Sequence, residues 1–443
     1  MNKQPVQAIS SMLPLVTVPP CLFEVLSTCR GAFGAPGFAT FVALVVGALG
    51  AVGPRTVTGM WVAAGLADRI HWSRAHRFFS EMKWEPDAVG LMLAQLVVTL
   101  FVAAGVPIVV AVDDTLFHRF GKLVHGAAWQ HDGSAKGRDG IGRGNCFVVV
   151  GLVVSVPFMA RSVLLPVLVR LYVPKETASK VELAREMVNL LSRAFAPRCI
   201  HVVADALYRG PAWRGLPDSV TFTTRLSCRA VLYGRAPQPT GKRGHPAWKG
   251  PRLGTASEVA GTVAWQKMTV IRYGEVGDVL VAEVACLWWG SLHRTPVRLV
   301  LVRDIDRRRK DLALITTDLA TPVEGIIARY CARWSIEQTI KDAKEILGAG
   351  DAQNRLEQAV QRTVPFMMLN LTILVCWYAK FGDAEHDLAE RRTWARWYRH
   401  KKTISIDDML IAFRRARITT VDPAQPTPDL IDDTAVTSTA AAA

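Results

Sequence analysis

Paired cysteines are absent from this sequence. Its eight cysteines are scattered along 443 residues, at positions 21, 29, 146, 199, 228, 286, 331 and 376, and no CxxC pair occurs. The lack of such pairs argues against a zinc site. Few cysteines in a long chain are typical of a reducing cytoplasm, where thiols stay free, so we expect a cytoplasmic protein.

The sequence also lacks a signal peptide and an unbroken membrane-spanning segment. The N-terminus, MNKQPVQAISSML, has neither the basic region nor the continuous apolar core of a secretory signal. Residues 31–53 and 88–112 are uncharged, but glycine and proline interrupt both of them. Residues 145–160 are short and rich in β-branched side chains, which indicates a buried strand. We therefore expect no membrane partner.

What the sequence has in excess is positive charge. Lys and Arg number 53 against 38 Asp and Glu, which gives a formal charge of +15 and an isoelectric point of about 9.7. This balance indicates a polyanionic partner, either nucleic acid or an anionic membrane surface. Half of the residues are hydrophobic, so the chain as a whole is not disordered, and it is long enough for two or three domains.

The first part of the chain is predicted to be a helical DNA-binding region. After an irregular arm with a short helix near residues 23–29, the pattern predicts helices at 38–49, 58–67, 72–82 and 86–104. The third helix and its lead-in, DRIHWSRAHRFFSE, mix aromatic side chains with basic ones, including Arg74 and Arg77. A small bundle that presents such a helix suits DNA binding. A basic amphipathic helix packed on the next domain is the alternative.

Strands and a helix follow. A β-branched run at 108–112 ends in Asp113-Asp114-Thr115. The Gly-rich basic segment 118–143 is predicted to be a hairpin or loop available to phosphates, with a plain solvated loop as the alternative. Strands are then predicted at 146–154, 161–172, 200–204 and 219–224, and a helix capped by Thr177 at 178–195. Pro166 indicates an edge strand or a bulge, and Asp205 ends the strand at 200–204.

Residues 226–318 have a different composition and are predicted to form a β-rich insertion. They contain basic turns rich in Gly and Pro. Their alternating pattern predicts strands at 262–271, 279–288, 295–303 and 312–317. From residue 322 the chain is helical again, with a buried helix at 363–377.

The stretch 330–344, YCARWSIEQTIKDAK, is predicted to form one continuous helix. It has no Gly or Pro and is rich in good helix formers. Helical periodicity places Tyr330, Arg333, Glu337 and Lys344 within an arc of roughly 60°, with Lys341 nearby and an apolar stripe beside them. One carboxylate is thus framed by a phenol and several cations. The alternative is an exposed face with a simple Glu337–Lys341 pair.

The C-terminal region is first basic and then acidic. Residues 391–402, RRTWARWYRHKK, hold six Arg or Lys and no acid, interleaved with Trp and Tyr. This pattern suits a helix that binds a nucleic-acid backbone, and a solvated helix with aromatic anchors is the alternative. Residues 421–443, with four Asp and no Lys or Arg, are predicted to be disordered.

Three acids stand out by their positions. Asp113 or Asp114 ends one predicted strand, Asp205 ends another, and Glu337 lies on the helix after the insertion. Hard divalent cations such as Mg²⁺ prefer oxygen ligands, and two such ions can activate a hydroxyl and stabilise the leaving oxygen in phosphoryl transfer. Three carboxylates from separate elements of a strongly basic protein fit that mechanism.

The helix at 330–344 carries a motif that resembles a known family. Tyr330-x2-Arg333-x3-Glu337-x6-Lys344 is similar to the Y-R-E-K signature of DDE transposases encoded by one large group of bacterial insertion sequences. The four residues match the signature in full. The β-rich insertion that precedes them is also similar to the one in that family.

Both upstream aspartates extend the resemblance. Asp113-Asp114-Thr115 looks like the first catalytic aspartate of the family, which often stands in an Asp-x-Thr pattern and so favours Asp113. The adjacent Asp114 would point to the opposite face of the strand. Asp205-x-x-Tyr208 looks like the second, although Leu207 stands where relatives often have glycine. The resemblance covers about residues 55–380.

The resemblance implies an α/β fold, with a ribonuclease-H-like catalytic core, a β-rich insertion and an N-terminal helical DNA-binding region. The expected divisions are an N-terminal arm and helical DNA-binding domain at 1–104, the core at 105–225 and 319–380, the insertion at 226–318, a basic C-terminal helical region at 381–420 and a disordered tail at 421–443.

The function implied is cut-and-paste transposition. The protein would bind terminal inverted repeats of duplex DNA, act as a homodimer when two ends are synapsed, and work in the bacterial cytoplasm near the nucleoid. Mg²⁺ or Mn²⁺ would be held by Asp113, Asp205 and Glu337, with Asp114 as the alternate to Asp113. The implied DNA-binding residues are Tyr330, Arg333, Lys344, Lys341, Arg74 and Arg77.

The same resemblance implies two further expectations. Related enzymes stack a tryptophan of the insertion near a flipped base, for which Trp265, Trp288 and Trp289 are candidates, although core packing is the simpler reading of each. We expect Glu337 to face the two aspartates, with Arg333 and Lys344 beside it toward the DNA. A catalytically inactive protein that binds transposon ends is the alternative function.

Overall fold

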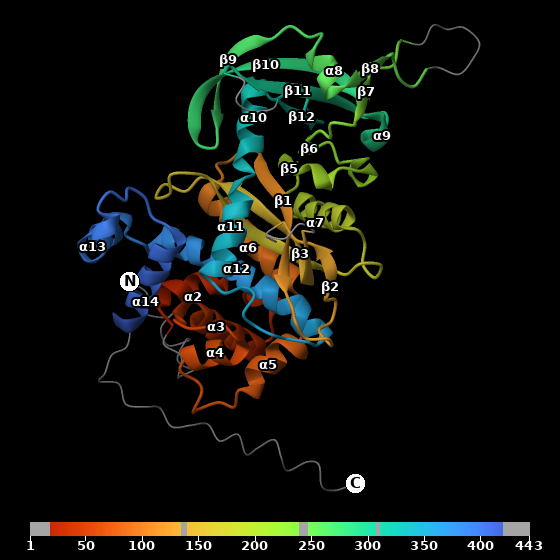
Figure 1. Ribbon diagram of the computed structural model, residues 1–443. Coiled ribbons are helices and arrows are strands. Elements are labelled where there is room, and N and C mark those ends of the chain that lie inside the picture. Colours follow the sequence, from red (N-terminus) through yellow and green to blue (C-terminus); the bar gives the residue numbers. More distant parts are fainter. Residues whose placement is uncertain (1–17, 134–139, 239–246, 307–310, 420–443) are drawn as a thin grey trace, which may run out of the picture.

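A computed structural model describes residues 18–133, 140–238, 247–306 and 311–419 (Figure 1). One long mixed sheet runs through the molecule, with the β-rich insertion at the top of the view and the N-terminal helices at the bottom. The predicted disordered tail, 421–443, lies outside the described residues.

The N-terminal region is helical, as its apolar periodicity predicts. It contains α2 (Pro20–Ser27), η1 (Arg30–Ala32), α3 (Ala35–Gly50), α4 (Val57–Ala63), α5 (Ser73–Ser80) and α6 (Pro86–Phe101). Pro86 occupies the first turn of α6, as predicted. Thr56 caps α4 by accepting a hydrogen bond from the Gly59 amide. α3 is buried on all sides because α4, α5, α12 and α14 surround it.

The core of the sheet combines parallel and antiparallel strands. β1 (Ile108–His118) runs antiparallel to β3 (Ile141–Val154) and parallel to β5 (Ile200–Ala204). β6 (Val220–Arg225) is parallel to β5, and β4 (Val163–Tyr172) pairs with β3. Helix α7 (Lys180–Ala194) packs on β3 and β4. This mixed α/β arrangement is consistent with a ribonuclease-H-like core.

Four local details bear on the predictions for this core. β1 continues to His118 because its pairing with β3 continues, so the two aspartates lie inside the strand rather than after it. Of the two forms predicted for the basic segment 118–143, hairpin or loop, the structure favours the hairpin, because β2 (Ala128–His131) pairs antiparallel with the start of β3. The predicted cap Thr177 is wrong, because Ser179 caps α7 through a capping box with Glu182. A register shift opposite Pro166 confirms the predicted bulge.

The strands of the insertion extend the core sheet. β12 (Leu312–Thr316) pairs antiparallel with β6, and β11 (Pro296–Asp304), β10 (Glu275–Leu287) and β9 (Gln266–Arg272) follow outward. The far edge is formed by β7 (Val231–Tyr233) and β8 (Arg252–Thr255), next to the short helices α8 (Ala256–Ala260) and α9 (Trp289–Leu292). The insertion is thus fastened to the core by a continuous ladder of backbone hydrogen bonds.

The continuous helix predicted at 330–344 is wrong. The chain forms two helices, α10 (Val323–Ala332) and α11 (Ser335–Glu345), with a bend between them. At the bend the amides of Arg333, Trp334, Ile336 and Glu337 bond to carbonyls three residues back rather than four. Such tight 3₁₀-type bonding changes the helix direction without requiring glycine or proline.

The longest helix, α12 (Glu357–Phe381), forms the centre of the helical region. It packs against α2, α3, α5, α6 and α14 and against β4. By length and composition it could cross a membrane, but 83% of its apolar window is buried inside the protein. It therefore has the character of a core helix, as the prediction for 363–377 states.

The C-terminal helices differ from the prediction. α13 (Ala384–Trp394) ends where a helix through 402 was expected, and the short helix η4 (Arg396–Tyr398) follows before α14 (Ile406–Thr419). Ala395 leaves the helical conformation, with φ −112° and ψ 79°. Arg392 donates two hydrogen bonds to the carbonyl of Lys401, which folds the segment back on itself.

Candidate active site

The adjacent aspartates of β1 point to opposite sides of the sheet, as strand geometry requires. Asp113 faces Arg333, whose guanidinium nitrogen lies 3.3 Å from the Asp113 carboxylate. Asp114 accepts hydrogen bonds from Lys180 Nζ at 2.6 Å and from the Tyr208 hydroxyl at 3.1 Å. The Asp114 carboxylate is therefore enclosed by α7 and the segment after β5, and only Asp113 looks toward α11.

The surroundings of Asp113 disfavour the ionised form of its carboxyl group. Burial, with help from the charges of Asp114 and Asp205, raises its pKa to about 6. The Arg333 charge and the hydrogen bond from the Asp114 amide act in the opposite direction. This balance leaves Asp113 in need of a nearby positive charge.

Asp205 lies beside Asp113 because of the pairing between parallel strands. Val112 of β1 is in register with Ala204, the last residue of β5, and an aspartate follows each of them. Asp205 is half-buried, and its charge acts on Asp113 and on Arg333. Its backbone carbonyl accepts a hydrogen bond from the Thr224 hydroxyl at 2.9 Å, which fixes the end of β5 against β6.

Arg333 lies between Asp113 and Glu337. Its second terminal nitrogen is 3.1 Å from Glu337 Oε1. The side chain of Arg333 is only 12% exposed, whereas that of Glu337 is 48% exposed. Glu337 thus lies on the expected side of the sheet, but the Arg333 guanidinium stands between Glu337 and Asp113. Arg333 itself is turned inward rather than outward, because the half-buried Asp113 carboxylate attracts it.

Tyr330 and Lys344 are also directed inward. Tyr330 is buried, and burial raises its pKa to about 12, so its phenol stays protonated. Lys344 Nζ donates to the Leu116 carbonyl at 2.8 Å and lies 4.9 Å from the centre of the Phe117 ring. Burial lowers the pKa of Lys344. The lysine attaches α11 to β1, which differs from the outward position expected for it.

The other predicted DNA-binding residues lie apart from this site. Lys341 is exposed and pairs only loosely with Glu345, at 3.9 Å. Arg74 donates to the Thr40 hydroxyl at 3.0 Å and so links α5 to α3. Arg77 is exposed on α5. Contact of these side chains with DNA stays a prediction.

The candidate tryptophans have different surroundings. Trp288 is buried in the core. Trp265 is covered by the Arg303 guanidinium at 4.0 Å and donates to the Ala260 carbonyl. Trp289 is half-exposed, and its ring centre lies 3.9 Å from that of His293. Core packing therefore accounts for Trp288, whereas Trp265 and Trp289 are both partly exposed and each has a cation over its ring.

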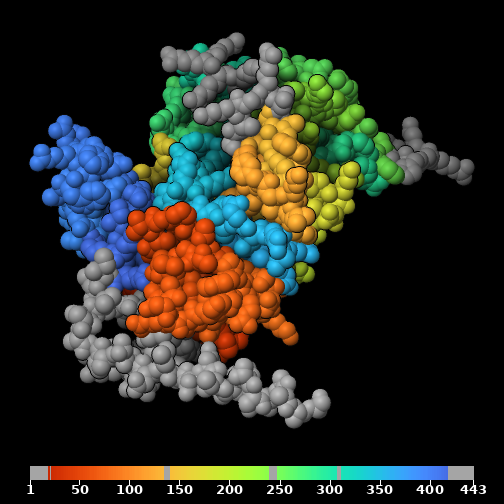
Figure 2. Space-filling view, turned by 60° about the horizontal axis from the view of Figure 1, so that its bottom comes forward, coloured from red at the N-terminus to blue at the C-terminus, as the bar shows by residue number. Residues whose placement is uncertain are grey.

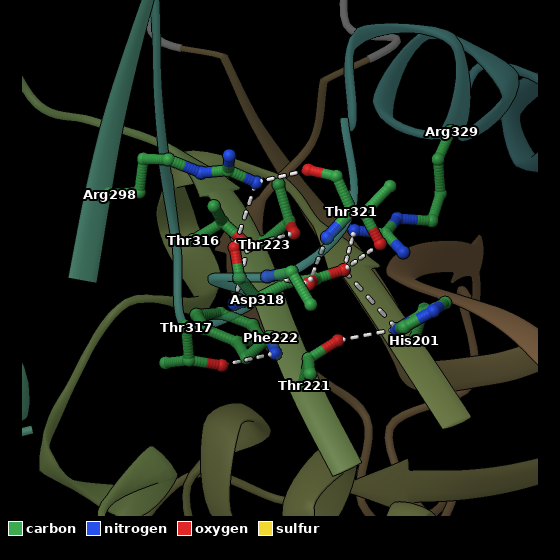
Figure 3. A network of polar contacts seen from close by, with 11 residues as sticks. His201, Thr221, Phe222, Thr223, Arg298, Thr316, Thr317, Asp318, Thr321 and Arg329 are labelled. Carbon is green, nitrogen blue, oxygen red and sulfur yellow. Dashed lines mark hydrogen bonds and ion pairs between the residues drawn. The ribbon is translucent and has the colours of Figure 1, made fainter. Parts of the chain in front are cut away.

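A buried polar network behind the site was not predicted from the sequence (Figure 3). Asp318 accepts hydrogen bonds from the Thr321 hydroxyl at 2.6 Å and from Arg329 at 2.7 Å. His201 Nδ1 lies 3.7 Å from Asp318 and 2.6 Å from the Thr221 hydroxyl. His201 is on β5 and Arg329 is on α10. The network therefore joins the strand that leads to Asp205 with the helix that leads to Arg333.

Charge and burial act differently on the two acid–base groups of the network. Burial opposes ionisation of Asp318, but hydrogen bonds from Thr321 and Arg329 outweigh it and hold its pKa well below the usual range. Burial and the Arg329 charge lower the pKa of His201 to about 4, against the attraction of Asp318. The ion pair is therefore Asp318 with Arg329, and His201 is a neutral member.

We expect neutral His201 to make the protein less stable in mild acid. Its pKa is near 6.5 in the unfolded chain and about 4 in the folded protein, so below pH 6.5 the unfolded state takes up the proton first. The contribution of this group to stability should fall by about 2 kcal/mol between pH 7 and pH 5. The measurement is urea unfolding of wild type and His201→Gln at both values. Equal losses for the two proteins would contradict the assignment.

The segment that carries the two aspartates of this site matches a known family. A family model described as DDE superfamily endonuclease matches residues 35–275, more than half of the chain. The matched segment contains Asp113 and Asp205, and Glu337 lies beyond it. No curated protein matches the chain.

Proposed function

Because the chain belongs to the DDE superfamily endonuclease family, which indicates transposase-type cleavage of DNA, we propose that it is a transposase of the Y-R-E-K group of insertion sequences. It would bind the terminal inverted repeats of its own element, cut the DNA there and join the ends to a target. Duplex DNA is then the substrate. Synapsis of two ends favours a DNA-bound homodimer, and the proposed place of action is the bacterial cytoplasm.

One observation carries the proposal. The register of β1 and β5 sets Asp113 beside Asp205 at the same edge of the sheet, and Arg333 connects Asp113 to Glu337. Three carboxylates from three separate elements thus lie around one guanidinium: Asp113 and Glu337 pair with Arg333, and the charge of Asp205 acts on it. Convergence of this kind is what phosphoryl transfer with divalent ions requires.

The carboxylates fit a hard divalent cation, provided that the Arg333 guanidinium moves. Asp113 and Asp205 offer oxygen donors and repel each other, so an ion such as Mg²⁺ or Mn²⁺ between them would relieve the repulsion. Within the described ranges, no three potential ligands are grouped closely enough to form a metal site in this conformation. Glu337 would complete the ligand set once the Arg333 guanidinium turns away. When bound, the metal would activate a water or a 3′-hydroxyl and stabilise the leaving oxygen.

The remaining side chains would position the DNA. A guanidinium forms two parallel hydrogen bonds with a phosphate as readily as with a carboxylate. Arg333 would therefore exchange Asp113 and Glu337 for the phosphate at the cleaved end. The protonated phenol of Tyr330 is a hydrogen-bond donor beside it, and Lys344 keeps α11 attached to β1.

The test of the proposal uses the DNA that flanks the coding region. The purified chain should cut this DNA at short inverted repeats in the presence of Mg²⁺, and EDTA should abolish cutting. Cleaved ends should then appear joined to a target plasmid. Cutting without joining would indicate a plain nuclease, and binding without cutting would indicate an inactive end-binding protein. Either result would reject the proposed reaction.

A further inference from the structure

The segment between α13 and α14 exposes large aromatic side chains. We call residues 394–402 the C-terminal knuckle. Trp397 is 76% exposed and Trp394 is 51% exposed, although tryptophan is usually buried. Neither ring belongs to the carboxylate site. Exposed aromatic rings on a basic surface are typical of contact with another molecule.

Ion pairs and cation–ring contacts hold the knuckle in a fixed shape. Arg391 is buried and pairs with Asp407 at 2.9 Å, and its guanidinium lies 4.9 Å from the centre of the Tyr398 ring. Lys401 lies 5.1 Å from the same ring and is paired with Asp408. Tyr398 thus packs against two cations whose charges are neutralised. A surface ordered in advance loses little conformational entropy when a ligand binds.

Three other cations of the knuckle remain available. Arg396, Arg399 and Lys402 are exposed. Within the part of the chain that the structure describes, none of the three forms an ion pair with an acid; the Arg399 side chain bonds only to the neighbouring His400. The cations therefore form two groups: Arg391, just before the knuckle, and Lys401 are neutralised by acids, whereas Arg396, Arg399 and Lys402 face solvent.

The knuckle belongs to the same body as the N-terminal helices. Helix α14, which follows it, packs on α3 and α12, and Arg414 donates a hydrogen bond to the Ala51 carbonyl. Figure 2 shows the C-terminal helical region (dark blue) projecting beside the N-terminal helices (red to orange). A ligand bound to the knuckle would therefore also lie near that helical region.

We propose that the C-terminal knuckle is a contact for duplex DNA outside the carboxylate site. Arg396, Arg399 and Lys402 bind phosphates, and the Trp397 ring packs on the adjacent sugar. This inference rests on the proposed DNA substrate. A second copy of the chain is a poorer partner, because in a symmetric dimer this patch would meet itself and its unpaired cations would repel each other.

The test measures binding of a fluorescent 40-base-pair duplex of unrelated sequence to the full chain, by anisotropy at several salt concentrations. The triple variant R396A/R399A/K402A should bind at least tenfold more weakly at physiological salt. The slope of log affinity against log salt should decrease by about 2 to 3, because each phosphate contact releases nearly one counterion. The control R193A/R252A/K267A removes three exposed cations elsewhere and should change neither value by as much.

The DNA affinity of Trp397 variants is a second, independent test. Trp397→Ala should weaken binding several-fold while the salt slope stays unchanged, because ring contacts release no counterions. Trp397→Phe should restore most of the affinity. Thermal melting of each variant should match that of wild type, since none of these four side chains supports the fold.

The inference is overturned if the triple variant and the control bind DNA equally well. It is also overturned if the triple variant keeps its DNA affinity but loses binding to phosphatidylserine vesicles, which would assign the patch to a membrane. If the wild type binds DNA through the knuckle but cuts no DNA, the proposed transposase reaction fails and the knuckle assignment stands.

Discussion

Asp113→Asn is expected to abolish DNA cleavage, with a loss of at least about 10³-fold in the single-turnover rate. The substitution keeps the shape of the side chain and removes its charge. Asp113 is the half-buried carboxylate that pairs with Arg333 and senses the charge of Asp205, so without it neither a metal ion nor Arg333 has its central partner. DNA binding, measured separately by anisotropy, should remain near the wild-type value.

Asp114→Asn is the matched control, since it removes the same charge from the neighbouring position. Its carboxylate holds Lys180 and Tyr208 on the other side of β1. The variant should lose stability, by up to about 3 kcal/mol, because a partly buried lysine loses its partner. Its cleavage rate per folded molecule should fall by less than about tenfold. A larger loss for Asp114→Asn than for Asp113→Asn would reverse the assignment.

Arg333→Ala is expected to have the second-largest effect, a loss of about 10² to 10³-fold in cleavage rate. The guanidinium supplies the positive charge between Asp113 and Glu337, and its removal leaves the half-buried Asp113 carboxylate without a cation. Arg333→Lys keeps the charge but not the planar fork, so it should recover only part of the loss. The measurement is single-turnover cleavage with saturating DNA.

The control for Arg333 is Arg193→Ala, which removes an exposed arginine near the end of α7. It should leave cleavage within about threefold of wild type, since exposed charges contribute little. If Arg333→Ala cleaved as fast as this control, the guanidinium would have no part in the reaction.

The sequence predicted the elements that carry the acids better than it predicted their orientation. Periodicity located β1, β5 and the helical stretch of Glu337, because apolar patterns mark which faces are buried. The alternation of side chains along a strand also separated Asp113 from Asp114 correctly. The resemblance favoured Asp113 as the aspartate that faces the site, and the structure places Arg333, a partner far away in the sequence, beside it.

Arg333 shows what local patterns cannot predict. As an arginine on a polar helix face, it was expected to extend toward the DNA. It turns inward because Asp113 is half-buried and needs a cation, and the burial of a distant strand residue is a tertiary property. The bend between α10 and α11 is also a feature that the local sequence does not predict. Its sequence contains no helix breaker, so packing rather than propensity sets the change of direction.

The Asp318 network escaped prediction for a related reason. Asp318, Arg329 and His201 belong to different elements, and none of them stands in a recognisable motif. A buried acid beside a buried arginine is visible only after the sheet and α10 have come together. The extension of the core sheet into the insertion was likewise not predictable, since strand order depends on contacts between distant segments.

Cleavage by Glu337→Gln is the most direct test that the three carboxylates form one active site. Glu337 is half-exposed and pairs only with Arg333 among the described residues, so the substitution should not disturb folding. The matched control is Glu345→Gln, an exposed glutamate at the end of the same helix. With Mg²⁺ and DNA carrying the terminal repeat, the account predicts loss of cleavage in Glu337→Gln and normal cleavage in Glu345→Gln. Full cleavage by Glu337→Gln would contradict it.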